Sequence, residues 1–430
     1  MNATLTEAAA GVESLLTYLT GTQRRTTAPA SGPNLRLARV LIEGWVHKAE
    51  AASAIVNPLM LASFPEAIEP VFADAAEAMA WCDQVRAILP AVVDLAYTLS
   101  LDEMCWRLAY AAESLLLNSA DIQGWKRIAE TGMLAAERVQ APMALSRMAL
   151  VRGAPRKMTG QIQAAVADYQ VAIGHLEGPD DSRLRTLAIN RMGAAYLVGR
   201  QLRQASDCFE QVLAGAEDDA AAGLATGNLA SVRLEEGDYG SAADLGERAL
   251  VLLVGAEPSL SGTFRNELVR GYARTGRFDV ATEHLRVNQE FTAGGPIYRR
   301  LGVLDSEGEL ALLQGRPSEA LVPLQQWLAI HGDLGTPTDH ADVLDLIGRA
   351  AAANNPARAR DIHQAALGWR RTADIDYLTA KTLRYLSGVE AVVGDHVSAE
   401  LYREEALALL EGIEDVAADG LRADLAGAAG

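Results

Sequence analysis

A short turn signal that recurs about every 39 residues constrains the fold of this 430-residue chain more than any other feature. Successive turn residues are separated by 39, 38, 39, 39, 39 and 40 residues, and an alanine follows each one five or six positions later. The turn residues are Gly160, Gly199, Gly237, Gly276, Gly315, Asn354 and Gly394, and the alanines are Ala165, Ala205, Ala242, Ala281, Ala320, Ala359 and Ala399. A fixed period of this length predicts an array of stacked units.

Each unit is expected to be a pair of helices. Glycine or asparagine can adopt the left-handed conformation that ends a helix, and the alanine after it lets two helices cross closely. Four residues beyond the alanine there is often an aromatic residue or leucine (Tyr169, Phe209, Leu324), on the same helix face and toward the core. One hairpin cannot bury its own apolar face, so neighbours must stack. The sequence therefore predicts an all-α, right-handed superhelical solenoid with a concave surface.

The repeats resemble the tetratricopeptide repeat. The residues that carry the resemblance are Gly193, Tyr196, Ala205 and Phe209, and, less completely, Gly153, Gly160, Ala165, Tyr169 and Ala172. The usual period of that repeat is 34 residues, so the longer period here implies longer helices or loops. Seven repeats are predicted over residues 140–412, with a degenerate eighth hairpin within residues 104–138.

The N-terminal part of the chain differs from the repeats. We expect residues 1–34 to form an amphipathic helix (4–19) and then a linker (21–34) rich in Thr, Pro, Gly and Ala. Residues 35–139 are expected to be a helical region that includes the degenerate repeat. Residues 413–430 are expected to be a C-terminal tail, whose alanine-rich end is typical of a fraying terminus.

Segments 41–58 and 72–96 resemble the entrance to the repeat region of large bacterial regulators of the AfsR (SARP-like) type. The positions that carry this resemblance are Pro58, Phe72, Glu77, Ala78 and Trp81. In those regulators a DNA-binding domain and an ATPase domain precede the repeats. This chain has no G-x-x-x-x-G-K-[ST] segment to hold nucleotide phosphates. Residues 1–64 carry five basic and four acidic residues, a net charge of 5 − 4 = +1, which is no DNA-binding footprint. The resemblance thus implies a regulatory interaction arm without those two activities.

Charge argues against two classes of partner. The chain carries 38 Lys and Arg against 56 Asp and Glu, a net charge of −18. This charge disfavours nucleic acid and anionic membrane surfaces as partners. The most apolar stretch, residues 87–101, is interrupted by Asp94 and Thr98, so no membrane span is expected.

The N-terminus has no signal-peptide pattern, and the three cysteines are scattered (Cys82, Cys105, Cys208). Both features predict a cytoplasmic protein with reduced, buried thiols.

No sequence motif for metal, nucleotide or nucleophilic chemistry is present, so we predict no catalytic residue, metal or cofactor. The densest polar group is HGDLGTPTDHAD, which contains His331, Asp333, Asp339, His340 and Asp342. These residue types can ligate a metal. The simpler interpretation is a loop between hairpins, with Asp339 or Thr338 capping the next helix.

Asp305 and Glu309 lie four residues apart and share a helix face. Paired carboxylates can perform acid–base chemistry when burial shifts their pKa values. The alternative is a solvated or ligand-facing edge.

A predicted binding groove follows from the repeat geometry. In this architecture the first helix of each hairpin lines the concave surface, so polar residues at one phase of successive first helices stack into a ladder. Asparagine amides can bind the backbone of an extended peptide, and arginines can pair with carboxylates. The predicted groove residues are Asn190, Asn228, Asn266, Arg270, Arg274, Asp305, Glu309, Lys381 and Arg384.

Two classes of function are open at this point. The leading hypothesis is an adaptor or regulatory sensor without catalytic activity, which binds a protein, a peptide or a small signal in the groove. The alternative is an enzyme of a biosynthetic pathway, with His340 or the Asp305 and Glu309 pair as acid or base. Titratable residues clustered in an enclosed pocket favour the enzyme, whereas an open, evenly lined groove favours binding.

Overall fold

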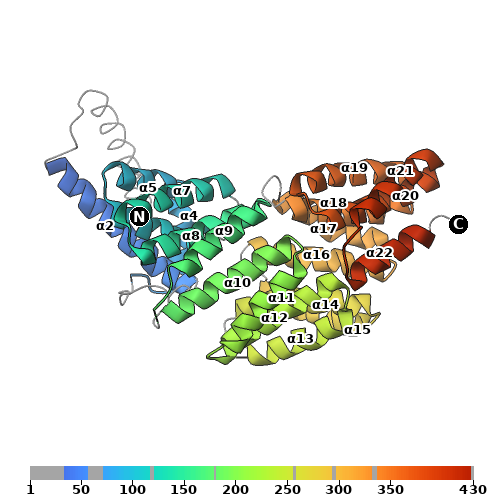
Figure 1. The fold of residues 1–430 in the computed structure, drawn as a ribbon, viewed down its shortest axis with the longest axis horizontal. Coiled ribbons are helices and arrows are strands. Elements are labelled where there is room, and N and C mark those ends of the chain that lie inside the picture. Colours follow the sequence, from blue (N-terminus) through green and yellow to red (C-terminus); the bar gives the residue numbers. More distant parts are fainter. Residues whose placement is uncertain are drawn as a thin grey trace, which may run out of the picture. The chain divides into compact units, whose positions relative to one another are not determined.

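The computed structural model describes residues 33–56, 71–116, 121–178, 181–254, 258–292, 297–331 and 337–427, whose only regular elements are helices (Figure 1). The helices in these ranges are α2 (Pro33–Val56), α4 (Ala75–Val85), α5 (Leu89–Thr98), α6 (Asp102–Leu116), α7 (Ile122–Val139), α8 (Pro142–Met158), α9 (Ile162–Gly174), α10 (Ser182–Val198), α11 (Leu202–Ala214), α12 (Asp219–Glu236), α13 (Tyr239–Leu252), α14 (Pro258–Arg274), α15 (Phe278–Thr292), α16 (Ile297–Leu313), α17 (Pro317–His331), α18 (Pro337–Ala352), α19 (Pro356–Ala373), α20 (Asp376–Val393), α21 (His396–Leu409) and α22 (Val416–Gly427). The predicted all-α class is confirmed. The predicted helix at 4–19, the linker up to residue 32, and Pro58 lie outside the described residues.

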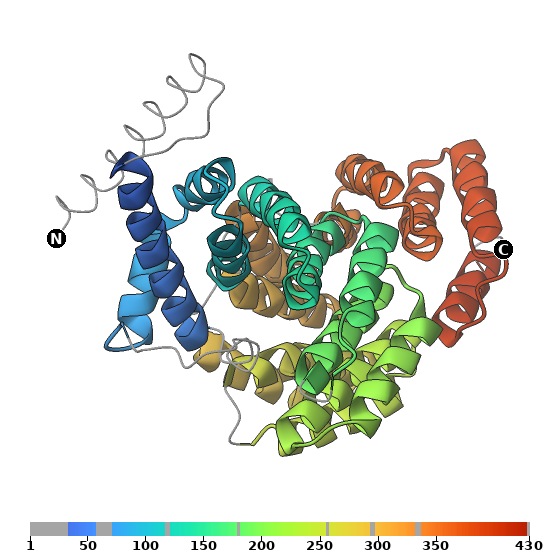
Figure 2. The ribbon, with the colours of Figure 1, turned by 60° about the vertical axis from the view of Figure 1, so that its left-hand side comes forward.

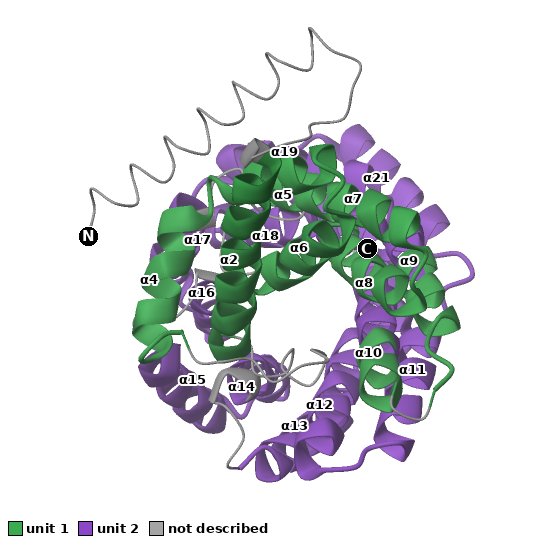
Figure 3. Ribbon diagram, turned by 90° about the vertical axis from the view of Figure 1, so that its left-hand side faces the viewer, with its two compact units in different colours: residues 1–156, 167–188 green, residues 157–166, 189–430 purple. Residues whose placement is uncertain are grey.

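The chain forms two compact units (Figure 3). Unit 1 comprises residues 1–156 and 167–188, and unit 2 comprises residues 157–166 and 189–430. This division passes through the first predicted repeat, so α9 and α10 contribute to both units. The predicted domain boundaries follow the repeat pattern instead, and they stay predictions.

Unit 1 is built around α6, which packs against α2 and α7. Two polar pairs connect α2 to α6. Ser53 and Ser114 hydrogen-bond at 2.8 Å, and Arg107 Nε donates to Glu50 Oε1 at 2.8 Å. The aromatic residues of the segment that resembles the AfsR-type regulators form one cluster, with the Trp81 ring 6.0 Å from the ring of Trp45.

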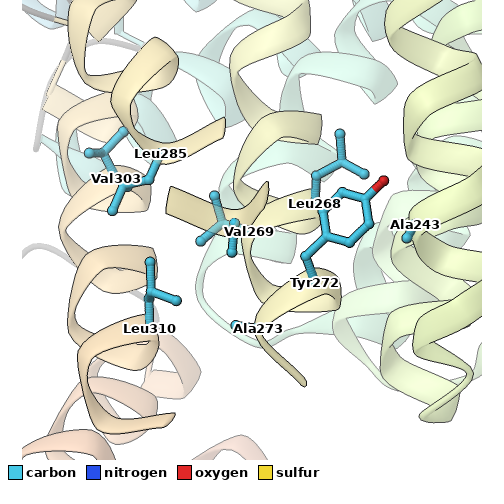
Figure 4. Close-up of a cluster of buried hydrophobic side chains, with 9 residues drawn as sticks. Ala243, Leu268, Val269, Tyr272, Ala273, Leu285, Val303 and Leu310 are labelled. Carbon is cyan, nitrogen blue, oxygen red and sulfur yellow. The ribbon is translucent and has the colours of Figure 1, made fainter. Parts of the chain in front are cut away.

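Unit 2 contains a succession of helical hairpins from α12 to α21 (Figure 2). Each even-numbered helix from α12 to α20 is the first helix of its hairpin and packs against the odd-numbered helix that follows it. Successive first helices also contact one another, as α12 contacts α14 and α14 contacts α16. α14 consequently buries two faces (Figure 4). Leu268 and Tyr272 point toward Ala243 of α13, whereas Val269 points toward Val303 and Leu310 of α16.

The turn signal performs the predicted role in most repeats. Gly160, Gly237, Gly276, Gly315 and Gly394 have φ between 73° and 94°, the left-handed region. Two predicted turn residues differ. In one repeat the left-handed residue is Arg200, with φ 53°, and not the predicted Gly199. In another, Asn354 lies outside the left-handed region, and Asn355 after it caps the N-terminus of α19. A Schellman-type turn needs one left-handed residue near the helix end, and its position can shift by a residue.

The small and large residues of the repeat also pack as predicted. All seven predicted alanines are buried, with at most 8% of their surface exposed. A side chain on the second helix fills the space beside a glycine of the first helix: Phe209 packs on Gly193, and Leu324 packs on Gly308. A Cβ on either glycine would lie within 3 Å of that side chain, so these glycines set the spacing within the hairpins.

The predicted fraying tail is wrong. Residues 416–427 form α22, whose Ala418, Leu421 and Leu425 are buried at a helical spacing. α22 contacts α12, α20 and α21, and in Figure 2 this red helix lies beside the light-green α12. Arg200 fixes the start of α22, because its Nη1 lies 2.8 Å from Asp415 Oδ2. An alanine-rich composition suggested fraying, but the apolar stripe of α22 has a surface on which to pack.

The three cysteines are buried and unpaired, as predicted. Burial raises the pKa of the Cys82 and Cys105 thiols to about 12. Within the described ranges, every helix is too short or too polar to cross a membrane.

Candidate functional site

The first helices of unit 2 bring predicted groove residues into direct contact across repeats. Asn228 Nδ2 on α12 donates to Asn190 Oδ1 on α10 at 2.7 Å. Among the described residues, the Asn190 amide N–H groups and the Asn228 carbonyl have no further hydrogen-bond partner. The ladder does not continue to Asn266, whose Oδ1 instead accepts from Asn288 Nδ2 on α15 at 2.7 Å.

The next step of the ladder is an ion cluster. Arg270 Nε and Arg274 Nε on α14 each lie 3.1 Å from a Glu309 oxygen on α16. About 30% of each arginine side chain is exposed, whereas Glu309 is 5% exposed. Although burial opposes ionisation of Glu309, the two guanidinium groups hold its pKa well below the usual range. Glu309 is thus the anion that organises two predicted binding residues.

Beyond Glu309, Asp342 on α18 joins three helices. Arg370 Nη2 on α19 donates to Asp342 Oδ1 at 2.6 Å, and Lys381 Nζ on α20 lies 3.4 Å from the same oxygen. Arg384, one turn further along α20, pairs with Asp424 of α22 at 2.8 Å. Among the described residues, every charged residue of the predicted ladder except Asp305 is therefore held in an ion pair.

A second set of buried polar groups lies behind Asp342. This Asp345 cluster consists of Asp345, His363, Arg370 and Thr382, none of which is more than 2% exposed. Asp345 Oδ1 lies 2.9 Å from His363 Nδ1, and its Oδ2 accepts from Thr382 Oγ1 at 2.6 Å and from Arg370 Nη2 at 3.3 Å. Both oxygens of the buried carboxylate are satisfied.

A pocket of about 250 Å³ lies between α14, α15 and α16. Its lining includes two carboxylates, Glu267 and Asp305, and two amides, Asn266 and Asn288. We call it the carboxylate pocket. Gly302 leaves room beside the Asn266 amide, because a Cβ there would lie 2.6 Å from Asn266 Nδ2. Arg270 and Arg299 also reach the lining.

Two residues that line this pocket each carry a buried oxygen that lacks a hydrogen-bond donor among the described residues. Asn288 is fully buried, and its Nδ2 donates to Gly262 O (2.8 Å) and to Asn266 Oδ1. Its Oδ1 receives no hydrogen bond from the described residues. Glu267 Oε2 is also buried without a hydrogen bond, since the nearest Arg270 nitrogen is 3.7 Å away. Buried acceptors without donors are costly in folded proteins.

The carboxyls of the pocket are held toward their neutral forms. Burial raises the pKa of Asp305 to about 7; Arg270 opposes the shift, while Glu309, Asp342 and Asp339 add to it. Burial also raises the pKa of Glu267, again against Arg270. Burial in the carboxylate pocket therefore disfavours the ionised form of both acids.

The HGDLGTPTDHAD segment has no metal-site geometry in its described part. Asp333 lies outside the described residues, and α18 begins at Pro337. His340 lies between two tryptophan rings, with centroids 6.3 Å from Trp327 and 5.0 Å from Trp369. Asp342 is bound to Arg370 and Lys381. Among the described residues no three His, Cys, Asp or Glu side chains form a group suited to a metal ion.

Sequence reasoning missed Glu267, Asn288 and Arg299 as pocket residues. Glu267 lies three residues before Arg270 and therefore on the same face of the helix. Glu267 could thus have been identified as a groove residue by the argument that identified Arg270. Asn288 carries no such signal. It lies on α15, a second helix, which the ladder argument did not consider.

Comparison with known proteins gives the fold. No family model matches the chain, and no curated protein matches it. Among solved structures, the Rap conjugation gene regulator of plasmid pLS20 in complex with the Phr* peptide is 12% identical, with a TM-score of 0.52 over 80% of this chain and 98% of that one. A Rap protein complexed with Competence and Sporulation Factor is 11% identical, with a TM-score of 0.49 over 75% and 97%. A STAND protein with a tetratricopeptide-repeat sensor from Pyrococcus horikoshii is 15% identical, with a TM-score of 0.44 over 85% and 56%.

This chain is a helical-repeat solenoid of the tetratricopeptide-like class. At such low identities the likeness concerns the fold alone. The resemblance to the AfsR-type regulators stays a prediction.

Proposed function

We propose that unit 2 binds an extended segment of a protein or peptide along its first helices, and that the protein is a regulatory adaptor or sensor. The observation that carries this proposal is a set of polar side-chain contacts between successive first helices. Asn190 contacts Asn228 (α10 and α12), Arg270 contacts Glu309 (α14 and α16), and Asp342 contacts Lys381 (α18 and α20). Amides can match the alternating donors and acceptors of an extended backbone, and the ion clusters on either side can select side chains.

Two likenesses support this reading. The Rap regulator of plasmid pLS20, which shares the fold, is described in complex with a peptide. The N-terminal resemblance to the AfsR-type regulators adds a regulatory setting, in which the chain acts on another protein through contact or through a change in superhelical curvature.

A selection experiment tests peptide binding. A random decapeptide library displayed on phage is selected against the full chain, and an enriched peptide is measured by fluorescence anisotropy. We expect the double variant Asn190→Ala/Asn228→Ala to weaken binding at least tenfold. Both members of the hydrogen-bonded pair are removed together, so neither amide is left facing a lost partner.

Gln325→Ala/Gln326→Ala is the matched control, because it removes two exposed amides from α17. This control should bind as the wild type does. Failure to enrich any peptide, or equal binding by the Asn190→Ala/Asn228→Ala variant, contradicts the proposal.

One observation favours the enzyme alternative. Asp305, whose pKa is raised to about 7, lines a pocket and is suited to exchange a proton near neutral pH. Its predicted partner Glu309 is engaged by two arginines, so the acid–base role would fall on Asp305 alone. Native mass spectrometry of a co-purified ligand, before and after incubation, tests this reading: an unchanged mass contradicts it.

A further inference from the structure

We propose that the carboxylate pocket binds a protonated nitrogen group, an alkylammonium or a guanidinium. The inference deepens the proposed function and rests on it in one respect, since it assigns this group to a basic side chain of the bound peptide. A free polyamine or agmatine-like molecule would offer the same chemistry.

The first argument is the set of acceptors. Asn288 Oδ1 and Glu267 Oε2 are buried and receive no hydrogen bond from the described residues. Exchanging the nitrogen and oxygen of the Asn288 amide by a flip would not supply the missing hydrogen bond, because its Nδ2 already donates to Gly262 O and to Asn266 Oδ1. The residues that line the pocket thus hold more buried acceptors than donors, which favours an occupant that only donates.

The second argument is charge. Glu267 and Asp305 line the pocket, and Asp305 has no ion pair among the described residues. Of the two basic residues in the lining, Arg270 has its Nε committed to Glu309. An anionic occupant would face these carboxylates, so a cation is favoured electrostatically.

The third argument is size. The pocket of about 250 Å³ equals the volume of about eight water molecules at roughly 30 Å³ each. This space suits the end of one long side chain and not a folded segment. Lys presents three donors and Arg presents five, and neither has an acceptor.

The test compares isosteric probes by isothermal titration calorimetry with the full chain at pH 8. The probes are three blocked tripeptides, acetyl-Ala-X-Ala-amide, in which X is arginine, lysine or citrulline, together with agmatine. Citrulline has the shape of arginine without its charge. We expect the arginine or lysine peptide to bind at least tenfold more tightly than the citrulline peptide. Equal affinities, or no binding by any cation, overturn the proposal.

Two isosteric variants locate the site. Glu267→Gln and Asp305→Asn should each weaken cation binding at least tenfold, while the exposed control Glu283→Gln on α15 should not change it. Circular dichroism melting curves check that each variant is folded. Unchanged binding by both pocket variants places the cation elsewhere and overturns the assignment.

The outcomes also separate this inference from the proposed function. If agmatine binds and the arginine peptide does not, the pocket accepts a free small cation, and the assignment to a peptide side chain is wrong. If a phage-selected peptide binds equally with arginine or citrulline at each basic position, the peptide-binding function stands and the cation pocket is wrong.

Discussion

The Asp345 cluster and the carboxylate pocket contain similar residue types in the same unit, yet their hydrogen bonding is opposite. In the Asp345 cluster, both carboxylate oxygens receive donors from Thr382, Arg370 and His363. In the carboxylate pocket, one oxygen of Glu267 and the amide oxygen of Asn288 receive none from the described residues. A satisfied polar network specifies one packing arrangement, whereas an unsatisfied one costs stability. The first is thus structural, and the second is where we propose that a ligand binds.

The largest loss of stability is expected when the Asp345 cluster is broken. Arg370→Met leaves Asp345 and Asp342 without their shared cation, and removal of one partner from a buried ion pair costs about 3–5 kcal/mol. Urea denaturation should show this loss in the free energy of unfolding of unit 2. The control Arg286→Met removes an exposed arginine that pairs only within α15, and should change stability by less than about 1 kcal/mol. A similar small loss for Arg370→Met would contradict a structural role for the Asp345 cluster.

A smaller loss is expected at Glu309, whose two arginines are partly exposed. Arg270→Gln/Arg274→Gln should lower the free energy of unfolding at pH 7 by about 2–3 kcal/mol, because Glu309 keeps its charge in a buried position. Adding Glu309→Gln should restore most of that loss. If the triple variant is no more stable than the double variant, the two arginines stabilise the fold in another way than by neutralising Glu309.

The pH dependence of stability distinguishes Asp305 from Glu309. The pKa of Asp305 is about 7 in the folded chain and about 4 in an unfolded one. The folded state therefore binds more protons in this interval, and the contribution of Asp305 to stability decreases as pH rises from 4 to 7. Asp305→Asn should equal the wild type near pH 4 and be more stable by about 1–2 kcal/mol at pH 8, after allowance for solvent screening.

Thermal melts from pH 4 to pH 8 measure this difference. Glu309, whose pKa is lowered, contributes in the opposite sense: its stabilisation is present above pH 4.5 and is lost as pH falls below that value. A wild-type curve parallel to that of Asp305→Asn over the whole range would mean that Asp305 is ionised normally.

The smallest effect on stability is expected at Gly302. Gly302→Ala places a methyl group against Asn266 Nδ2 without changing any charge, and the helical preference of alanine offsets the crowding, so stability should change by less than about 1 kcal/mol. Cation binding in the pocket should nevertheless weaken several-fold, as measured by calorimetry. Gly388→Ala is the matched control on α20, where a Cβ has open space. Normal binding by Gly302→Ala would show that the ligand does not reach the Asn266 side of the pocket.

The sequence by itself determined the repeat architecture of this protein. The 39-residue period, the left-handed glycines and the buried alanines are local signals that repeat many times, so an error in one repeat does not alter the prediction. The first-helix phase also placed Arg270, Arg274 and Glu309 together, because residues at one phase of adjacent parallel units must face one another.

Only the tertiary structure decided which polar residues are satisfied. Asn266 pairs with Asn288 of a second helix and not with Asn228, and Glu267 lines the same pocket as Asp305. These outcomes depend on how closely α14, α15 and α16 approach one another, since a change of about 1 Å makes or breaks a hydrogen bond. The helical character of residues 416–427 was readable from their spacing, but their docking on α12 and α20 was not. Docking requires the repeats to bring α12 within reach of α22, and the curvature that does so is the sum of many small rotations between repeats.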